Sequence, residues 1–258
     1  MITNEWNINA EVIDAVLVIR FDRPEKKNAL TISMYAQLNT LIEEARKSPD
    51  IRAVVFGSTS DSFTAGNDLK DFLHYATTEI DEEAPVFQFL HHIATFDKPL
   101  IAAVRGLAVG IGLTLLLHCD FVYVADDVKL MAPFVNLGLV PEFGSSKLLV
   151  ELVGERQAAE ILILGNVISG ERAVEMGIAN EMLSANEVES RALKTARILT
   201  TKPPEALRLS KELIRPKTEI LRVMEKENEY IKRQLGSAEA IEAITAVLEK
   251  RKPNFQAN

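Results

Sequence analysis

Short apolar runs alternate with segments of helical periodicity in the first half of the chain. Residues 10–21 are rich in β-branched side chains and end at the breaker Asp22-Arg23-Pro24, which predicts one strand followed by a loop. From Thr31 to Lys47 apolar side chains recur every three or four positions, which predicts a helix capped by Thr31. Other short apolar runs predict strands over residues 52–56, 100–104 and 121–124. Strands that alternate with helices in this way favour an α/β architecture.

The pattern becomes helical after Val150. Segments punctuated by Gly or Pro predict helices over residues 157–164, 170–176, 185–200 and 204–214. Residues 218–251 are charged and amphipathic, which is typical of helices that coat a domain or meet a neighbouring subunit. No fixed-period repeat is found in the sequence.

Charge and cysteine content narrow the function classes. A formal net charge of −8 disfavours a nucleic-acid surface over the whole chain. Cys119 is the single cysteine, which excludes an intrachain disulfide framework and a cysteine-cluster metal site. The N-terminal segment has no basic residue before Arg20, and the longest apolar stretch, residues 106–117, is shorter than the ~20 residues that span a bilayer. We therefore expect a cytoplasmic protein without a membrane segment.

Two glycine-bearing loops each precede a predicted helix. The first is Phe63-Thr-Ala-Gly-Asn-Asp-Leu69, in which Gly66 permits a tight turn and either Asn67 or Asp68 is suited to cap the following helix. The second is Arg105-Gly-Leu-Ala-Val-Gly-Ile-Gly112, which opens an apolar helix toward Cys119. Unpaired backbone N–H groups at helix starts favour negative charge, so two such loops brought together would hold one oxyanion.

The sequence does not match the motifs of nucleotide-binding loops, catalytic triads or histidine metal sites. A dinucleotide fingerprint lacks its third glycine, because Leu115 stands in that position, and a P-loop lacks its Gly-Lys-Ser/Thr. Adjacent residues in His118-Cys119-Asp120 point in different directions and form no triad. His91-His92 has no third ligand at helical spacing. We therefore expect no metal site and assign no catalytic role to a histidine.

The successive motifs resemble those of the crotonase superfamily. They are Arg23-Pro24 with Lys27-Asn-Ala-Leu30, then Ala65-Gly-Asn-Asp-Leu69, then residues 103–112 through Cys119-Asp120, then Pro133 with Gly138-Leu-Val-Pro141, and the terminal residues 250–255. The resemblance implies an α/β fold with a crotonase-like spiral of ββα units over residues 1–200. It implies a C-terminal helical oligomerisation region over residues 201–258, assembly as a homotrimer or a dimer of trimers, and acyl-CoA thioester substrates without a separate cofactor, since coenzyme A is part of the substrate.

The same resemblance assigns the site residues. The backbone N–H groups of Asn67 and Ile111 form the oxyanion hole, which agrees with their positions at predicted helix starts. Lys27 and Lys250 match residues that reach coenzyme A, the first at a phosphate and the second from a neighbouring subunit. The remaining substrate-binding positions lie in the same motifs: Ala29, Leu30, Ala65, Gly66, Asp68, Leu69, Gly110, Thr114 and Phe134. For Asp68 a structural helix cap, and for Thr114 a hydroxyl bonded back into its own helix, are the competing interpretations.

The catalytic carboxylates distinguish the reactions of the superfamily. Its hydratases use two glutamates, and this chain has Thr114 and Phe134 at those positions, neither of which acts as a base at neutral pH. Glu142 stands in a Pro-Glu-x-x-Ser-Ser loop that resembles the Δ3,Δ2-enoyl-CoA isomerases of the peroxisomal type. The resemblance makes Glu142 the single base that moves a proton from C2 to C4 of a 3-enoyl thioester. The alternatives are an enoyl-CoA hydratase-like enzyme with another acyl-CoA reaction, such as hydrolysis, decarboxylation, dehalogenation or carbon–carbon cleavage, and a non-catalytic crotonase-fold binding protein.

Overall fold

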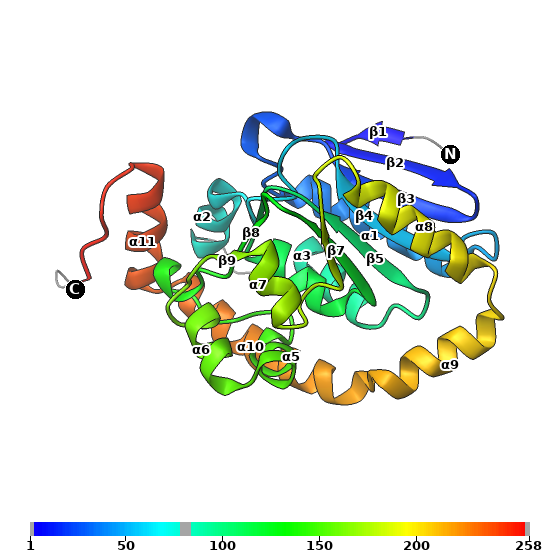
Figure 1. Ribbon diagram of the computed structural model, residues 1–258. Coiled ribbons are helices and arrows are strands. Elements are labelled where there is room, and N and C mark those ends of the chain that lie inside the picture. Colours follow the sequence, from blue (N-terminus) through cyan, green and yellow to red (C-terminus); the bar gives the residue numbers. More distant parts are fainter. Residues whose placement is uncertain (1–2, 78–83, 256–258) are drawn as a thin grey trace.

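The computed structural model describes residues 3–77 and 84–255 (Figure 1). Within them the strands are β1 Thr3–Glu5, β2 Ile8–Ile13, β3 Val16–Phe21, β4 Ala53–Ser58, β5 Leu100–Val104, β6 Leu107–Val109, β7 Phe121–Ala125, β8 Lys129–Met131, β9 Ile168–Ser169 and β10 Glu181–Leu183. One sheet has the order β1-β2-β3-β4-β5-β7-β10, and the other has the order β6-β8-β9. In the larger sheet β3, β4, β5, β7 and β10 run parallel, whereas β1 and β2 are antiparallel neighbours.

The described helices include the ones expected from the periodicity. They are α1 Ile32–Lys47, α2 Leu69–Thr77, α3 Pro85–Ala94, α4 Ile111–Thr114, α5 Ser145–Val153, α6 Glu155–Leu162, α7 Gly170–Glu175, α8 Val188–Thr200, α9 Pro204–Ile214, α10 Lys217–Leu235 and α11 Ala238–Leu248, with short 3-10 turns at Pro24–Lys26, Leu115–His118 and Val135–Leu137. The predicted cap of α1 is confirmed, because the Thr31 hydroxyl accepts the Met34 N–H at 3.3 Å. In Figure 1 α9 and α10 follow the lower edge of the molecule, and α11 lies at one side.

The central strands of the larger sheet are buried on both faces. Along β4, Val54 and Phe56 belong to the main core, whereas Ala53 and Val55 belong to a second cluster on the opposite face. Successive side chains of a strand point to opposite faces, so a strand buried on both faces reads as a continuous apolar run. Helix α8 packs against β4, β5 and β7 and covers the second cluster. The apolar runs of the sequence therefore mark the centre of the fold.

Strands of the two sheets alternate with helices along the chain. The chain passes from β5 in the larger sheet to β6 in the smaller one and then into α4, and it passes in the same way from β7 to β8 and on toward α5. Thr64, which follows β4, pairs with Ala108 of β6 and extends the pattern by one unit. The α/β fold is thus the expected crotonase-like spiral of ββα units. The units repeat in space without a sequence repeat, because the segments between their strands differ in length.

One expectation about local structure was wrong. Residues 10–21 lie in two strands, because Asp14 (φ 51°) and Ala15 (φ 63°) form a tight turn between β2 and β3. The sequence did not reveal this turn, since neither of its central residues is Gly or Pro. The apolar helix expected toward Cys119 is present as α4 followed by a 3-10 turn, and β6 lies inside the second glycine loop.

Gly106 is expected to be essential for stability. It follows β5 with a φ of +59°, and a Cβ atom there would lie 1.9 Å from the carbonyl oxygen of Asp61. The Gly106→Ala substitution should therefore lower the free energy of unfolding by about 3 kcal/mol or more. Urea denaturation measures the loss, with Gly154→Ala (φ +82°, no atom within 4 Å of the Cβ) as the variant that carries backbone strain without the clash. Equal losses in the two variants would contradict the steric explanation.

Candidate active site

The first glycine loop leaves the backbone N–H of Asn67 unpaired. Leu30 bridges this loop on either side of Asn67: its N–H donates to the Gly66 carbonyl, and its carbonyl accepts the Asp68 N–H, both at 2.8 Å. This parallel pattern uses the neighbours of Asn67 and leaves its own N–H directed away from Leu30. Among the described residues no acceptor lies within hydrogen-bond reach of it. The amide is therefore available to a ligand.

The second glycine loop leaves the N–H of Ile111 unpaired for a different reason. Ile111 is the first residue of α4, and the first N–H groups of a helix have no acceptor within that helix. Gly110, with φ 57° and ψ −115°, turns the chain into α4 while its own N–H donates to the Met131 carbonyl at 2.8 Å. No acceptor for the Ile111 N–H is found in the part of the chain that the structure describes.

Backbone contacts bring the two loops together. The Val109 N–H donates to the Thr64 carbonyl at 3.0 Å. A Cβ atom on Gly66 would lie 2.9 Å from the Val109 carbonyl oxygen, so the close approach requires glycine there. Asn67 and Ile111 consequently line one cavity of about 360 Å³. The sequence did not show whether the two glycine loops meet, and in the structure they do.

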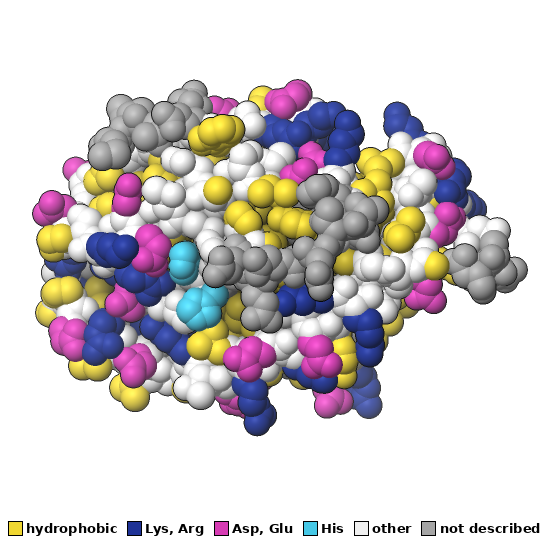
Figure 2. Space-filling view, turned by 180° about the vertical axis from the view of Figure 1, so that it is seen from behind, with side chains coloured by type: hydrophobic (Ala, Val, Ile, Leu, Met, Phe, Trp, Pro, Cys, Tyr) yellow, Lys and Arg dark blue, Asp and Glu magenta, His cyan; other side chains and the backbone are white. Residues whose placement is uncertain are grey.

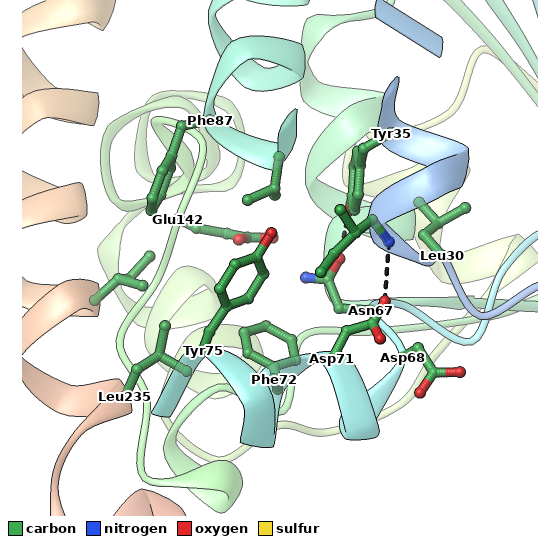
Figure 3. Close-up of a pocket in the computed structure, with 13 residues that line it drawn as sticks. Leu30, Tyr35, Asn67, Asp68, Asp71, Phe72, Tyr75, Phe87, Glu142 and Leu235 are labelled. Atoms are coloured by element: carbon green, nitrogen blue, oxygen red, sulfur yellow. Dashed lines mark hydrogen bonds between the residues drawn. The ribbon is translucent and has the colours of Figure 1, made fainter. Parts of the chain in front are cut away.

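Glu142 lies on the wall of the same cavity, in the loop between the 3-10 turn 135–137 and α5. Its side chain is buried, with 6% of the residue exposed, and its Oε1 atom has no hydrogen-bond partner within the described chain. Glu142 also lines a smaller pocket, which is drawn in Figure 3, and there its carboxyl group is directed toward Tyr75 and Asn67. Burial raises the pKa of Glu142 to about 8, and the charge of Glu227 adds to the rise. Such a carboxyl group can both take and return a proton near neutral pH.

The pKa of Glu142 predicts a pH dependence of stability. A carboxyl group with a pKa of about 8 in the folded state and an ordinary value of 4.5 holds its proton longer in the folded state. Its contribution is therefore fully present below about pH 4.5 and is lost as the pH rises toward about 8, by a few kcal/mol. We expect Glu142→Gln to become more stable relative to the wild type as the pH rises from 5 to 8, measured by urea denaturation at each pH. A difference independent of pH would contradict the raised pKa.

The loop that carries Glu142 is held from behind by His118. Phe143 has a positive φ of 61°, and its ring stacks on the His118 imidazole with 3.9 Å between the ring centroids. His118 Nε2 lies 2.7 Å from the Phe143 carbonyl oxygen and donates to it in the neutral ring. Burial lowers the pKa of His118 to about 3, so the ring is neutral. His118 therefore acts as a structural support.

A second, smaller cavity of about 30 Å³ adjoins the larger one and shares with it Asn67, Phe72, Glu142 and Ile231. It carries aromatic and aliphatic side chains from α1, α2, α3 and α10. The Tyr35 hydroxyl donates to Asn67 Oδ1 and fixes the Asn67 side chain (Figure 3). Three helices that the sequence analysis did not connect with the site thus contribute to it: Tyr35 on α1, Phe87 on α3, and Ile231 and Leu235 on α10. Their positions read as ordinary core positions in the sequence, and nothing in the local pattern marks them as cavity residues.

Most of the expected site residues lie at the cavities. The larger cavity is lined by Asn67, Ile111 and Glu142 together with Ala65, Gly66, Leu69, Gly110 and Phe134. The smaller cavity is lined by Leu30 and Asp68. Asp68 also has the structural role considered for it, since it accepts the Lys70 N–H at 3.0 Å and pairs with Arg23 at 2.7 Å. Desolvation opposes ionisation of Asp68, but the bonds from Arg23 outweigh it and hold its pKa below the ordinary value.

Four of the expected residues do not line either cavity: Lys27, Ala29, Thr114 and Lys250. Lys27 and Lys250 are exposed, whereas Thr114 is buried in α4. The Thr114 hydroxyl has no partner among the described atoms, so the bond into its own helix is not formed either. The two lysines stay predictions as coenzyme A contacts.

The described residues were compared with three other kinds of site: a metal centre, a membrane-spanning helix and a basic surface. No group of three or more His, Cys, Asp or Glu side chains in this part of the chain is arranged to hold a metal ion. None of the described helices combines the length and apolar character needed to cross a bilayer. On the face seen in Figure 2 acidic and basic side chains are interspersed, which gives that face no extended basic surface.

A spiral of ββα units that directs two unpaired amides and one buried carboxyl group into a single cavity defines a protein of the crotonase class. The Enoyl-CoA hydratase/isomerase family matches residues 11–258. The chain therefore belongs to this family.

Named relatives include both reaction types of the family. The chain is 34% identical over 244 residues to Enoyl-CoA delta isomerase 2 of Rattus norvegicus, which covers 92% of this chain and 62% of the relative. It is 31% identical to Crotonyl-CoA hydratase of Syntrophomonas wolfei, with 96% of this chain and 97% of the relative covered. Among solved structures, Pseudomonas aeruginosa OdaA superposes with a TM-score of 0.90 at 42% identity over 95% of this chain and 99% of that chain. The chain thus spans less than two thirds of the length of the rat isomerase.

Proposed function

We propose that this protein is a Δ3,Δ2-enoyl-CoA isomerase that uses Glu142 as its single base. The observation that carries the proposal is the position of Glu142 in the larger cavity. Of the described residues that line this cavity, Glu142 alone has an ionisable side chain, and it shares the cavity with the free amides of Asn67 and Ile111. One carboxyl group and one anion-binding pair are what a 1,3-proton shift requires.

The proposed reaction moves one proton. The Glu142 carboxylate takes a proton from C2 of a 3-enoyl thioester, and the electron pair of the C–H bond enters a dienolate whose oxygen accepts hydrogen bonds from the Asn67 and Ile111 amides. The protonated Glu142 then returns the proton to C4, and the double bond moves into conjugation with the thioester. A carboxyl group with a pKa of about 8 suits both steps, because it neither holds nor loses the proton too strongly at neutral pH.

Water activation by two carboxylates has less support in this cavity. The positions of the hydratase glutamates carry Thr114, which lines neither cavity, and Phe134, which lines the larger one with an apolar ring. An apolar wall keeps the dienolate from solvent, and it also strengthens the hydrogen bonds to the two amides.

The test is an absorbance assay with purified protein. A short 3-enoyl-CoA should give rising ultraviolet absorbance as the conjugated 2-enoyl thioester forms, and 2-enoyl-CoA supplied in parallel should show little loss. Rapid loss of 2-enoyl-CoA without isomerisation would favour a hydratase. Binding of both thioesters with no turnover would favour the non-catalytic crotonase-fold protein.

A further inference from the structure

A buried carboxylate from the C-terminal helical region lies directly behind the Glu142 loop. Glu227 is on α10, 85 positions beyond Glu142 by residue number, and 6% of it is exposed. Its Oε2 accepts the Gly144 N–H at 2.5 Å, and its Oε1 accepts the Ser146 N–H at 3.0 Å and the Ser146 hydroxyl. Burial raises the pKa of Glu227 above its ordinary value, whereas the three bonds, all of which it accepts, counter that rise and favour the ionised carboxylate.

These contacts act on the segment that carries the base. Gly144 has a φ of 70° and is followed by the first residues of α5, whose N–H groups have no acceptor one turn earlier in the helix and attract negative charge. The Ser145 N–H donates back to the Glu142 carbonyl at 3.0 Å. A shift of the Gly144 to Ser146 backbone would therefore be transmitted to Glu142. The segment from Gly144 to Ser146 donates two backbone N–H groups and one hydroxyl group to Glu227.

We propose that Glu227 is a positioning residue of the reaction: from α10 it fixes the loop that aims Glu142 into the cavity, and it places a carboxylate behind that base. This inference rests on the proposed function, because it assigns a second role within the same proton transfer. It makes α10 a part of the catalytic apparatus in addition to its role in covering the core.

Other titratable groups lie around Glu142, but none of them is a cause of its raised pKa as Glu227 is. Those facing it or sharing its cavity wall come from α1, α2, the first glycine loop and the segment before β7: Tyr35, Tyr75, Asp71, Asp68 and His118. Burial raises the pKa of Tyr35 and of Tyr75, so both are neutral near pH 8. Asp68 pairs with Arg23, Asp71 accepts the Ile32 N–H at 2.9 Å, and His118 is neutral. The charge of Glu227 is the one that raises the pKa of Glu142 beyond the effect of burial.

The experiment is the pH profile of isomerisation in Glu227→Gln. Removal of the charge should move the rising limb of kcat/KM to lower pH by about one unit, since a like charge nearby favours the protonated form of a carboxyl group. The matched control is Glu225→Gln, which removes an exposed carboxylate from the same helix and should leave the midpoint in place. An unchanged midpoint in folded Glu227→Gln would overturn the proposed charge effect.

A second variant tests the positioning role even where Glu227→Gln does not fold. Glu227→Asp keeps the charge and draws it back from the three donors, so kcat should fall about tenfold while KM and the midpoint of the pH profile stay near their wild-type values. An unchanged kcat in Glu227→Asp would overturn the positioning role. The two proposals fail separately, because full activity in Glu142→Gln would remove the proposed function itself, whereas loss of activity there with no response at Glu227 would remove this inference alone.

Discussion

Glu142→Gln should lower kcat for 3-enoyl-CoA isomerisation by about 10³-fold or more, since the amide cannot take the C2 proton and no other ionisable side chain among the described residues lines the larger cavity. The substitution keeps the size of the side chain and removes a buried carboxyl group whose Oε1 has no partner. We therefore expect the variant to fold and to bind acyl-CoA thioesters with little change in affinity. The absorbance assay measures kcat, and calorimetric titration with a saturated acyl-CoA measures binding.

A control variant and a binding measurement test whether the loss of activity in Glu142→Gln is specific. Glu151→Gln, which changes an exposed carboxylate on the following helix α5, is the matched control and should keep wild-type turnover. A Glu142→Gln enzyme with wild-type kcat would show that another group moves the proton, and the isomerase assignment through Glu142 would be wrong even with the crotonase fold established. A parallel loss of thioester binding would instead point to a damaged cavity.

Ile111→Pro should lower kcat by about 10²- to 10³-fold, because it removes one of the two amides that receive the dienolate oxygen. Ile111 is the first residue of α4, where proline is well tolerated since its missing N–H has no partner in the helix. The buried side chain becomes smaller, and this has its own cost in stability. The measurement is kcat and KM in the absorbance assay, together with the urea midpoint.

Ile111→Val separates the two effects, because it shortens the side chain and keeps the N–H. The ratio of kcat between the valine and proline variants then reports the amide. Equal activity in both would mean that the Ile111 amide does not bind the developing oxyanion. A large rise in KM with unchanged kcat in the proline variant would mean that the amide binds the ground-state thioester as strongly as the dienolate.

The sequence indicated a role for Glu142 but not for Glu227. Glu142 was found because it lies in a short motif beside Pro141 and Ser145-Ser146, within a series of motifs that runs along the chain. Glu227 lies in the charged helix 217–235, among exposed acidic and basic neighbours such as Glu225 and Lys226. Its helical period places it on the buried face, but nothing local shows that three donors from residues 144–146 meet it there.

The sequence by itself determined the alternation of strands and helices, the helix from Ile32 to Lys47 with its Thr31 cap, the two glycine loops and the family resemblance. These features depend on local periodicity, on capping and on motif residues that adjoin one another. The tertiary structure alone decided that Asn67, Ile111 and Glu142 share a cavity, that Thr114 does not line it, and that α1, α3 and α10 line the smaller cavity beside it. It also decided the pKa of Glu142, because desolvation and the charge of Glu227 arise from packing between segments far apart in the chain.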